Sequence, residues 1–299
     1  MKNYKVGFFG DDIWAHNTVK LLSKDKSINV KFICGRYFTK DKTLKKISNR
    51  KKIKFLKVQN VNSSNFYKFL KNQDVDILVS MSFDQIFKKK IIELVKGNII
   101  NCHAGKLPFY RGRSVLNWVL INGEKEFGIT THFINNKIDQ GKIINQNIFK
   151  IRKKDNFKSL LKKCHKHCAL LLYKTVKQIQ NKNYNALPQS KFSKNFSYFR
   201  KRGKGDEILD LGLKSDRIRN FVRGLVKPGP YARIRLKNNE ILIKKVTIIN
   251  NKIKSTLKNQ FLNLKRDKLY FKTIDNKIIR IDEWSSKFKI NKDLQLNLK

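Results

Sequence analysis

The fold is decided by a strand–helix–strand pattern over residues 76–103, which read DILVSMSFDQIFKKKIIELVKGNIINCH. Residues 76–81 and 98–102 are mostly apolar runs with the length of buried strands. Between them, residues 88–95 have helical spacing, and Gly97 stands where a helix commonly ends. Two buried strands joined by a helix indicate a right-handed βαβ unit of a parallel sheet, and such sheets bind ligands at the carboxyl ends of their strands.

The same alternation precedes and follows this unit. Further strands are predicted over residues 4–9, 29–34, 53–57, 127–133 and 143–151. Further helices are predicted over residues 13–23, 65–70, 115–121 and 157–181. Together these segments predict an α/β catalytic domain over residues 1–188, with a Rossmann-like, mostly parallel sheet flanked by helices.

The last third of the chain has a different pattern. Residues 189–206 are polar and basic, and we interpret them as a linker laid over the first domain. From residue 207 to residue 299, one short helix at 215–225 is followed by strand-like runs at 231–236, 240–249, 261–264, 268–271 and 277–281. This order predicts a small β-rich C-terminal domain that is barrel-like, or OB-like.

Composition limits the class of protein. Of the 299 residues, 40% are hydrophobic, which suffices for a core, and no apolar run has the length of about 20 residues that crosses a bilayer. We therefore expect a cytoplasmic protein with no membrane partner. The net charge of +46 would suit a phosphate-rich partner such as tRNA or a nucleotide-linked substrate, but the lysines are spread over the whole chain, which favours compositional drift.

Three polar residues are placed to perform acyl transfer to an amine. Asn101 and His103 share one face at the end of the strand 98–102, and Asp139 lies in the loop between two predicted strands. An oxyanion formed by attack on an acyl carbon needs hydrogen-bond donors, which Asn101 and a protonated His103 supply. Asp139 accepts the proton of the attacking amine, directly or through water, and favours charged His103. This chemistry requires neither a metal nor a covalent intermediate.

The residues around this trio resemble a known family. Residues 99–124 read IINCHAGKLPFYRGRSVLNWVLINGE, residues 127–133 read FGITTHF, and residues 138–146 read IDQGKIINQ. The order Asn-x-His, Leu-Pro, Tyr-Arg-Gly, Gly-Ile-Thr-x-His and Asp-x-Gly resembles the folate-dependent formyltransferases, which comprise the methionyl-tRNA formyltransferase family and the related amino-sugar formyltransferases. The resemblance covers most of the chain and is looser after Gly205. It implies 10-formyltetrahydrofolate as the formyl donor and Asn101, His103 and Asp139 as the catalytic residues.

The resemblance also implies where ligands bind. The folate pocket is expected at the end of the strand before the catalytic one and in the Asp139 loop, with these residues as contacts: Ser80, Met81, Ser82, Phe83, Asp84, Gln85, Ile138 and Gly141. The acceptor is expected near these residues: Gly105, Lys106, Leu107, Pro108, Arg111 and Arg113. Gly105 and Lys106 stand where the family often has Ser-Leu.

The sequence leaves two candidates for the amine acceptor. The stretch Arg111-Gly-Arg-Ser-Val-Leu-Asn-Trp118 is closer to the sugar-modifying branch and favours a nucleotide-linked amino sugar, with a homodimer left open. The C-terminal domain and the basic charge suit the amino group of initiator methionyl-tRNA. An inactive binding module and a formyltetrahydrofolate hydrolase are more remote, because the catalytic residues are intact and the N-terminus leaves no room for the hydrolase's usual extra domain.

Two further segments contain histidines outside the catalytic trio. Cys164-His-Lys-His-Cys168 lies on one predicted helix, which cannot close a tetrahedral site by itself, so we predict no metal. All four cysteines are expected to be reduced thiols. His132 follows Thr131 on a predicted strand, where a structural role is favoured over a role near the site.

Overall fold

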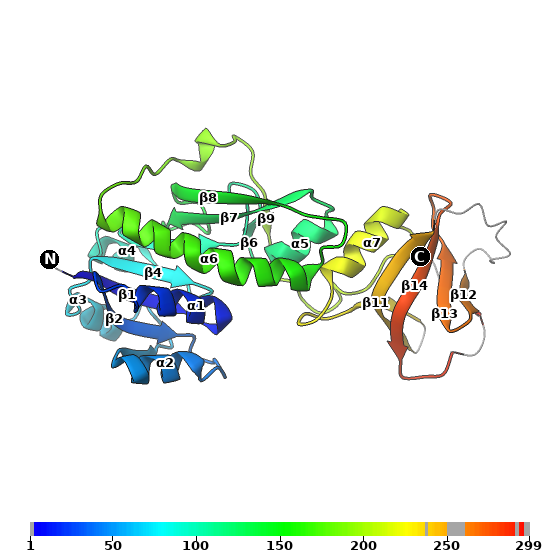
Figure 1. Cartoon of the computed structure of the whole chain (residues 1–299), viewed down its shortest axis with the longest axis horizontal. Coiled ribbons are helices and arrows are strands. Elements are labelled where there is room, and N and C mark those ends of the chain that lie inside the picture. Colours follow the sequence, from blue (N-terminus) through cyan, green and yellow to red (C-terminus); the bar gives the residue numbers. More distant parts are fainter. Residues whose placement is uncertain (1–2, 237–238, 250–260, 291–292, 296–299) are drawn as a thin grey trace. The chain divides into compact units, whose positions relative to one another are not determined.

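The computed structural model describes residues 3–236, 239–249, 261–290 and 293–295. Two compact units form, and neither is continuous in the sequence (Figure 1). The first unit holds Met1–Gly112, Phe127–Phe149 and Lys162–Phe199, and the second holds Arg113–Glu126, Lys150–Leu161 and Arg200–Lys299. The domain limits at residues 188 and 207 stay a prediction.

A seven-stranded sheet forms the first unit. Its strands are β1 (Tyr4–Gly10), β2 (Ile28–Gly35), β3 (Lys54–Lys57), β4 (Ile77–Met81), β5 (Ile99–His103), β7 (Glu126–Phe133) and β8 (Ile143–Lys150). They lie in the order β3-β2-β1-β4-β5-β7-β8. The strands from β3 to β5 pair in parallel and β7 is antiparallel to β5, which confirms the predicted mostly parallel sheet.

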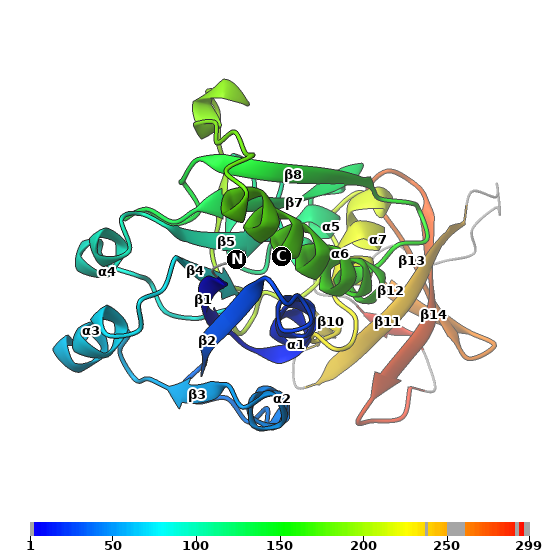
Figure 2. The ribbon, with the colours of Figure 1, turned by 60° about the vertical axis from the view of Figure 1, so that its left-hand side comes forward.

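Helices cover both faces of this sheet. They are α1 (Asp12–Leu22), α2 (Thr43–Lys51), α3 (Ser64–Lys71), α4 (Lys89–Leu94) and α6 (Phe157–Gln180). Figure 2 shows α1, α2 and α6 on one face and α3 and α4 on the other. On the α3 and α4 face, the ring of Phe9 meets four others edge-on, those of Phe32, Phe66, Phe83 and Phe87. The strand ends are therefore held by a packed core.

Helix α2 is a helix of this sheet domain that the sequence analysis did not predict. Its nine residues, TLKKISNRK, carry only two aliphatic side chains, and both Leu44 and Ile47 are buried. So short and polar a helix gives little periodic signal, and it is held by packing against α1 and β2 rather than by propensity.

The second unit combines two helices with an antiparallel sheet. The helices are α5 (Val115–Ile121) and α7 (Ser215–Gly224). The strands are β10 (Ala232–Arg235), β11 (Glu240–Ile249), β12 (Phe261–Lys265), β13 (Lys268–Lys272), β14 (Ile278–Ser286) and β15 (Leu294–Gln295). Their order is β10-β11-β14-β13-β12-β15, and α7 packs on β11 over a buried aliphatic core. This confirms a small antiparallel, strand-rich C-terminal region.

The segment interpreted as a linker contains two short elements. They are a 3₁₀ turn, η1 (Gln189–Lys191), and β9 (Tyr198–Phe199). β9 pairs in parallel with β6 (Arg111–Gly112), so this segment lies against the first unit as far as Phe199.

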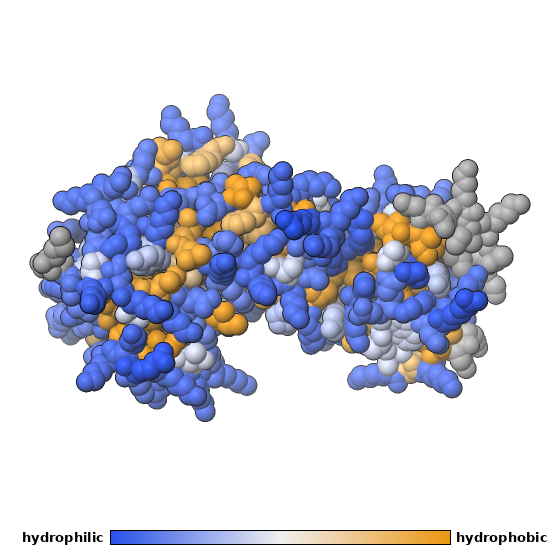
Figure 3. Space-filling view, viewed as in Figure 1, coloured by the Kyte–Doolittle hydropathy of each residue, from blue (hydrophilic) through white to orange (hydrophobic). Residues whose placement is uncertain are grey.

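Hydrophilic side chains are distributed over nearly the whole visible face of each unit rather than gathered in one place (Figure 3). Within the described part of the chain, no helix is both long and apolar enough to cross a membrane.

Candidate active site at the end of strand β5

Asn101 and His103 occupy the carboxyl end of β5, and the antiparallel neighbour β7 adds a third side chain. Asn101 pairs with His132 across the two strands, and His103 pairs with Thr130. Residues directly opposite in such a pair have neighbouring side chains on one face of the sheet. The Asn101 Nδ2 atom lies 3.4 Å from His132 Nε2. The register of β5 and β7 therefore builds one polar cluster.

Asp139 completes this cluster from its loop, as the sequence predicted. Its Oδ2 atom lies 3.7 Å from His103 Nδ1, and its Oδ1 atom lies 3.6 Å from His132 Nε2. The backbone N–H of Gly112 donates to Oδ2 at 2.8 Å. Burial by itself would raise the pKa of Asp139, but the charges of His103 and His132 and the Gly112 N–H outweigh it and hold that pKa well below its usual range.

The proton arrangement of His103 follows from its partners. Its Nε2 atom lies 2.6 Å from the carbonyl oxygen of Tyr110. A carbonyl only accepts, so Nε2 carries a hydrogen, and Nδ1 is the nitrogen left to exchange a proton beside Asp139. A Cβ on Gly105 would come within 2.5 Å of both His103 Nε2 and the Tyr110 carbonyl oxygen. The glycine is therefore needed for the orientation of the imidazole.

His132 belongs to the cluster, contrary to the structural role that the sequence favoured. Its side chain is 2% exposed, and its Nδ1 donates to the carbonyl oxygen of Phe133 at 2.8 Å. Its Nε2 is then the atom that faces Asn101 and Asp139. His132 lies opposite Asn101 only because of the register in which β5 and β7 pair. Such a register is not readable from any local sequence pattern.

Gln189 was assigned to the linker, and the structure places it under the Asp139 loop. Its amide Nε2 donates to the carbonyl oxygens of Asp139 at 2.7 Å and Gly141 at 3.0 Å. Its Oε1 accepts from Arg111 Nε at 3.1 Å and Nη2 at 2.6 Å. The guanidinium of Arg111 also lies over the ring of Phe196, 4.7 Å from its centroid. One buried amide thus ties the Asp139 loop to Arg111.

The residues predicted to contact folate have different environments. Met81 is 1% exposed and Ser80 is buried, so both side chains are part of the sheet core. The Gln85 side chain is engaged with the backbone of Val61 and Val58, and Phe83 packs on Phe9.

Three further residues of this predicted set lie nearer the surface. The hydroxyl of Ser82 accepts a hydrogen bond from Arg36 Nη2 at 2.8 Å, and Asp84 and Ile138 are exposed. Gly141 is buried, and a Cβ there would overlap the carbonyl oxygen of Phe133. Ser82 follows β4 directly and Gly141 lies beside the last residue of β7, and the contacts of the eight predicted residues with folate stay a proposal.

The loop expected to meet the acceptor is mostly buried. Gly105, Leu107 and Pro108 are buried, and Lys106 is half-buried. The carbonyl oxygen of Gly105 accepts from Thr130 Oγ1 at 2.7 Å, and that of Leu107 accepts from Gln146 Nε2 at 2.8 Å. These bonds fix the loop against β7 and β8. Arg113 is exposed and lies in the second unit.

The cysteines are free thiols in the described part of the chain, and all four are buried. Cys102 and Cys168 approach each other where β5 packs on α6. Burial raises the pKa of Cys168 well above that of an ordinary thiol, with the neighbouring thiols adding to it. Across the described residues, no three histidine, cysteine or acidic side chains are grouped to hold a metal ion.

Comparison with known proteins agrees with this geometry. The model of the formyl transferase family matches residues 24–176, about half of the chain, and this range includes Asn101, His103, His132 and Asp139. The chain therefore belongs to the formyl transferase family.

Particular relatives fall into two groups. The bifunctional polymyxin resistance protein ArnA of Wigglesworthia glossinidia brevipalpis is 37% identical over 207 residues, which are 69% of this chain and 31% of that protein. The chain thus matches less than a third of ArnA. The methionyl-tRNA formyltransferase of Alkaliphilus oremlandii is 30% identical over 214 residues, which are 72% of this chain and 67% of that protein.

Solved structures share the fold along nearly the whole chain. WlaRD, a sugar 3N-formyl transferase solved in the presence of dTDP and 5-N-formyl-THF, matches with a TM-score of 0.70 and 24% identity over 97% of this chain and 100% of that chain. The N-formyltransferase of Helicobacter canadensis, solved with folinic acid and dTDP-3-aminofucose, matches with a TM-score of 0.69 and 23% identity over 93% and 98%. At these identities the likeness is one of fold.

Proposed function

We propose that this chain transfers a formyl group from 10-formyltetrahydrofolate to the primary amine of a nucleotide-linked amino sugar. The observation that carries the proposal is the convergence of Asn101, His103 and Asp139 at the end of β5, in a chain of the formyl transferase family. The amine nitrogen attacks the formyl carbon, the carbonyl oxygen becomes an oxyanion, and the bond from carbon to N10 of the folate breaks. The proton lost by the amine ends on N10.

Each residue of the cluster has a role that its contacts support. Asn101 Nδ2 donates to the oxyanion, and protonated His103, held through Nε2 by Tyr110, presents Nδ1–H to the same centre. The carboxylate of Asp139 takes the amine proton, directly or through water. Its low pKa makes that acceptance transient, so the proton passes on to N10. His132 and Gln189 are positioning residues, which hold Asp139 by its side chain and its backbone.

The choice of acceptor rests on the sequence from Arg111 to Trp118, which resembles the sugar-modifying branch. The solved structures with dTDP or a dTDP-sugar, which share the fold over nearly the whole chain, support the same choice. A folate donor is supported by the 5-N-formyl-THF and folinic acid in those structures. A homodimer stays a prediction that sedimentation of the purified chain would check.

A second candidate is formylation of initiator methionyl-tRNA. Relatives at 30% identity with this name match about two thirds of their own length, and the net charge of +46 would attract an RNA. The dispersed lysines favour the amino sugar, because selective tRNA binding needs a defined basic surface.

The proposal is tested by incubating the purified chain with 10-formyltetrahydrofolate and a panel of amines that includes nucleotide-linked amino sugars and methionyl-tRNA. We expect an N-formylated amino sugar and an equal amount of tetrahydrofolate. Release of formate without any formylated amine would instead identify a hydrolase, and absence of both products would identify a binding module.

A further inference from the structure

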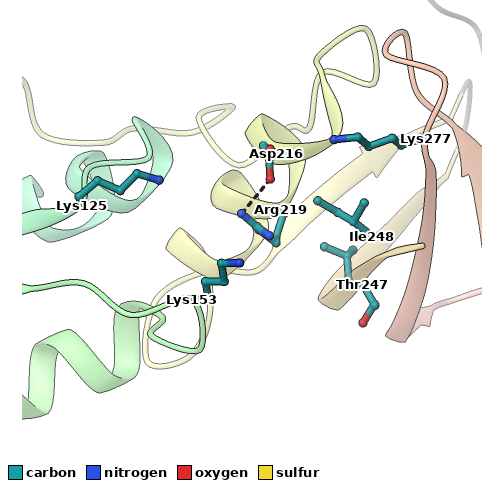
Figure 4. Close-up of a pocket in the computed structure, with 8 residues that line it drawn as sticks. Lys125, Lys153, Asp216, Arg219, Thr247, Ile248 and Lys277 are labelled. Carbon is teal, nitrogen blue, oxygen red and sulfur yellow. Dashed lines mark ion pairs between the residues drawn. The ribbon is translucent and has the colours of Figure 1, made fainter. Parts of the chain in front are cut away.

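The second unit contains a hollow of about 510 Å³ that is separate from the β5 cluster. Four cations line it, Lys125, Lys153, Arg219 and Lys277, together with one acid, Asp216. Aliphatic side chains of β11, among them Ile248, form its floor. Figure 4 shows these side chains extending from the turn after α5, from the loop before α6, from α7 and from the C-terminal sheet. We call this feature the basic hollow.

The cations of the basic hollow are not balanced by acids. Asp216 Oδ1 pairs with Arg219 Nη2 at 2.8 Å, and Lys277 lies 3.7 Å from Asp275. Among the residues that the structure describes, Lys125 and Lys153 have no ion-pair partner. The Nε atom of Arg219 is buried and, within the same described part of the chain, lacks a hydrogen-bond acceptor. A buried guanidinium N–H without an acceptor is costly, so the site is suited to an incoming anion.

Hydrogen bonds fix the segments that carry these cations. Ile151 N donates to the carbonyl oxygen of Lys125 at 2.7 Å, which ties the turn after α5 to the loop of Lys153. Arg223 of α7 donates to the carbonyl oxygens of Arg152 and Asp155 on either side of Lys153, at 3.2 and 3.3 Å. The backbone around Lys153 is therefore hydrogen-bonded to α7. The same helix carries Arg219, which precedes Arg223 by four residues.

The fourth cation, Lys277, is held by Asp275 of the C-terminal sheet region. Asp275 accepts from Ser215 N at 2.9 Å and from Ser215 Oγ at 2.8 Å, at the start of α7. These hydrogen bonds and that of Thr273 outweigh burial, which by itself would raise the pKa of Asp275, and lower it to about 2. Asp275 thus stays ionised and keeps Lys277 at the rim of the basic hollow.

We propose that the basic hollow binds the phosphate groups of a small ligand of nucleotide size. Its volume lies in the range of about 300–1,000 Å³ that is usual for small-molecule sites. The planar guanidinium of Arg219 matches a phosphate in two hydrogen bonds, and lysines add mobile point charges. The aliphatic floor accommodates the uncharged part of the ligand. This site is independent of formyl transfer, since none of its residues lies in the β5 cluster.

The test is a titration of the full chain with inorganic pyrophosphate in about 0.15 M salt, followed by calorimetry. The pocket variant Lys153→Gln/Arg219→Gln is compared with the control Lys154→Gln/Arg217→Gln, which removes the same charge from the same loop and the same helix outside the lining. We expect the pocket variant to weaken binding at least about tenfold and the control to change it less than twofold. Equal weakening in both variants would mean diffuse attraction and would overturn the proposal.

Two further arms keep the test decisive. Arg219→Lys retains the charge without the planar fork, and we expect intermediate affinity with an unchanged unfolding midpoint. A short RNA duplex is titrated in parallel, and both double variants should weaken its binding equally. RNA binding that depends on Lys153 and Arg219, with pyrophosphate binding unaffected, would assign the basic hollow to a nucleic-acid backbone and overturn a small ligand.

Discussion

At the end of β5 the carboxylate of Asp139 lies beside two histidines and a backbone N–H, whereas four cations and one carboxylate line the basic hollow, and only Arg219 and Lys277 of these cations have an ion-pair partner among the described residues. The first region matches each charge with a partner at a fixed distance. The second leaves positive charge uncompensated. A reaction centre needs fixed donors where charge develops, while an anion site needs charge that the protein itself does not neutralise. The difference separates a catalytic site from an anion-binding site within one very basic chain.

The largest expected effect is at His103, because its Nδ1–H is both a hydrogen-bond donor to the oxyanion and the exchangeable proton beside Asp139. We expect His103→Ala to lower kcat by about 10²-fold or more, with folate affinity retained. The matched control is His167→Ala, a half-buried histidine of α6 that packs on Phe149. Steady-state kinetics and a folate titration of both variants check this. Near-normal turnover of His103→Ala would reduce His103 to a structural anchor.

Gly105 tests whether the cluster depends on the orientation of the imidazole. An added methyl group would press on His103 Nε2 and the Tyr110 carbonyl, so we expect Gly105→Ala to lower kcat by roughly tenfold or more. Gly203→Ala is the control, because a Cβ there meets no atom closer than 3.9 Å. An active Gly105→Ala variant with an unshifted His103 NMR signal would contradict the assigned geometry.

Gln189 tests the positioning of the Asp139 loop. Gln189→Glu keeps an acceptor for Arg111 but removes the donor to the carbonyl oxygens of Asp139 and Gly141. We expect a several-fold loss in kcat, a smaller change in KM and a loss of stability of about 1–3 kcal/mol. Gln140→Ala, an exposed neighbour in the same loop, should change neither. Equal effects of the two variants would place Gln189 outside the mechanism.

Much of this was predictable from the sequence, and the limits are physical. The apolar runs of β4 and β5 predicted the sheet, and the Asn-x-His spacing predicted that Asn101 and His103 share a face, because alternation along a strand is a local property. Asp139 lies in a loop, and its catalytic role was predicted from the resemblance to the formyltransferases. A structural role was favoured for His132, and Gln189 was assigned to the linker, because both reach the cluster through strand pairing and chain return, from 31 and 88 residues beyond Asn101 by sequence number. The residues that line the basic hollow come from five separate segments, so no single stretch of sequence predicts it.

The smallest expected effect is on stability at low pH. Because the folded protein lowers the pKa of Asp139, its contribution to stability is complete above the unfolded pKa of about 4 and is lost as pH falls below it. Asp139→Asn removes this contribution, so its stability should fall less steeply between about pH 4 and pH 2. Urea unfolding at a series of pH values checks the slope. Parallel profiles for the variant and the original chain would mean that Asp139 is not stabilised as an anion.

The most direct measurement of the central claim is competition between acceptors across a salt series. Formylation of a nucleotide-linked amino sugar and of initiator methionyl-tRNA by 10-formyltetrahydrofolate is followed in one mixture up to about 0.3 M salt. The account predicts that the amino sugar is formylated throughout, because the buried β5 cluster is little screened, and that RNA binding is weak and unselective. Selective tRNA formylation at physiological salt, with no sugar product, would contradict it.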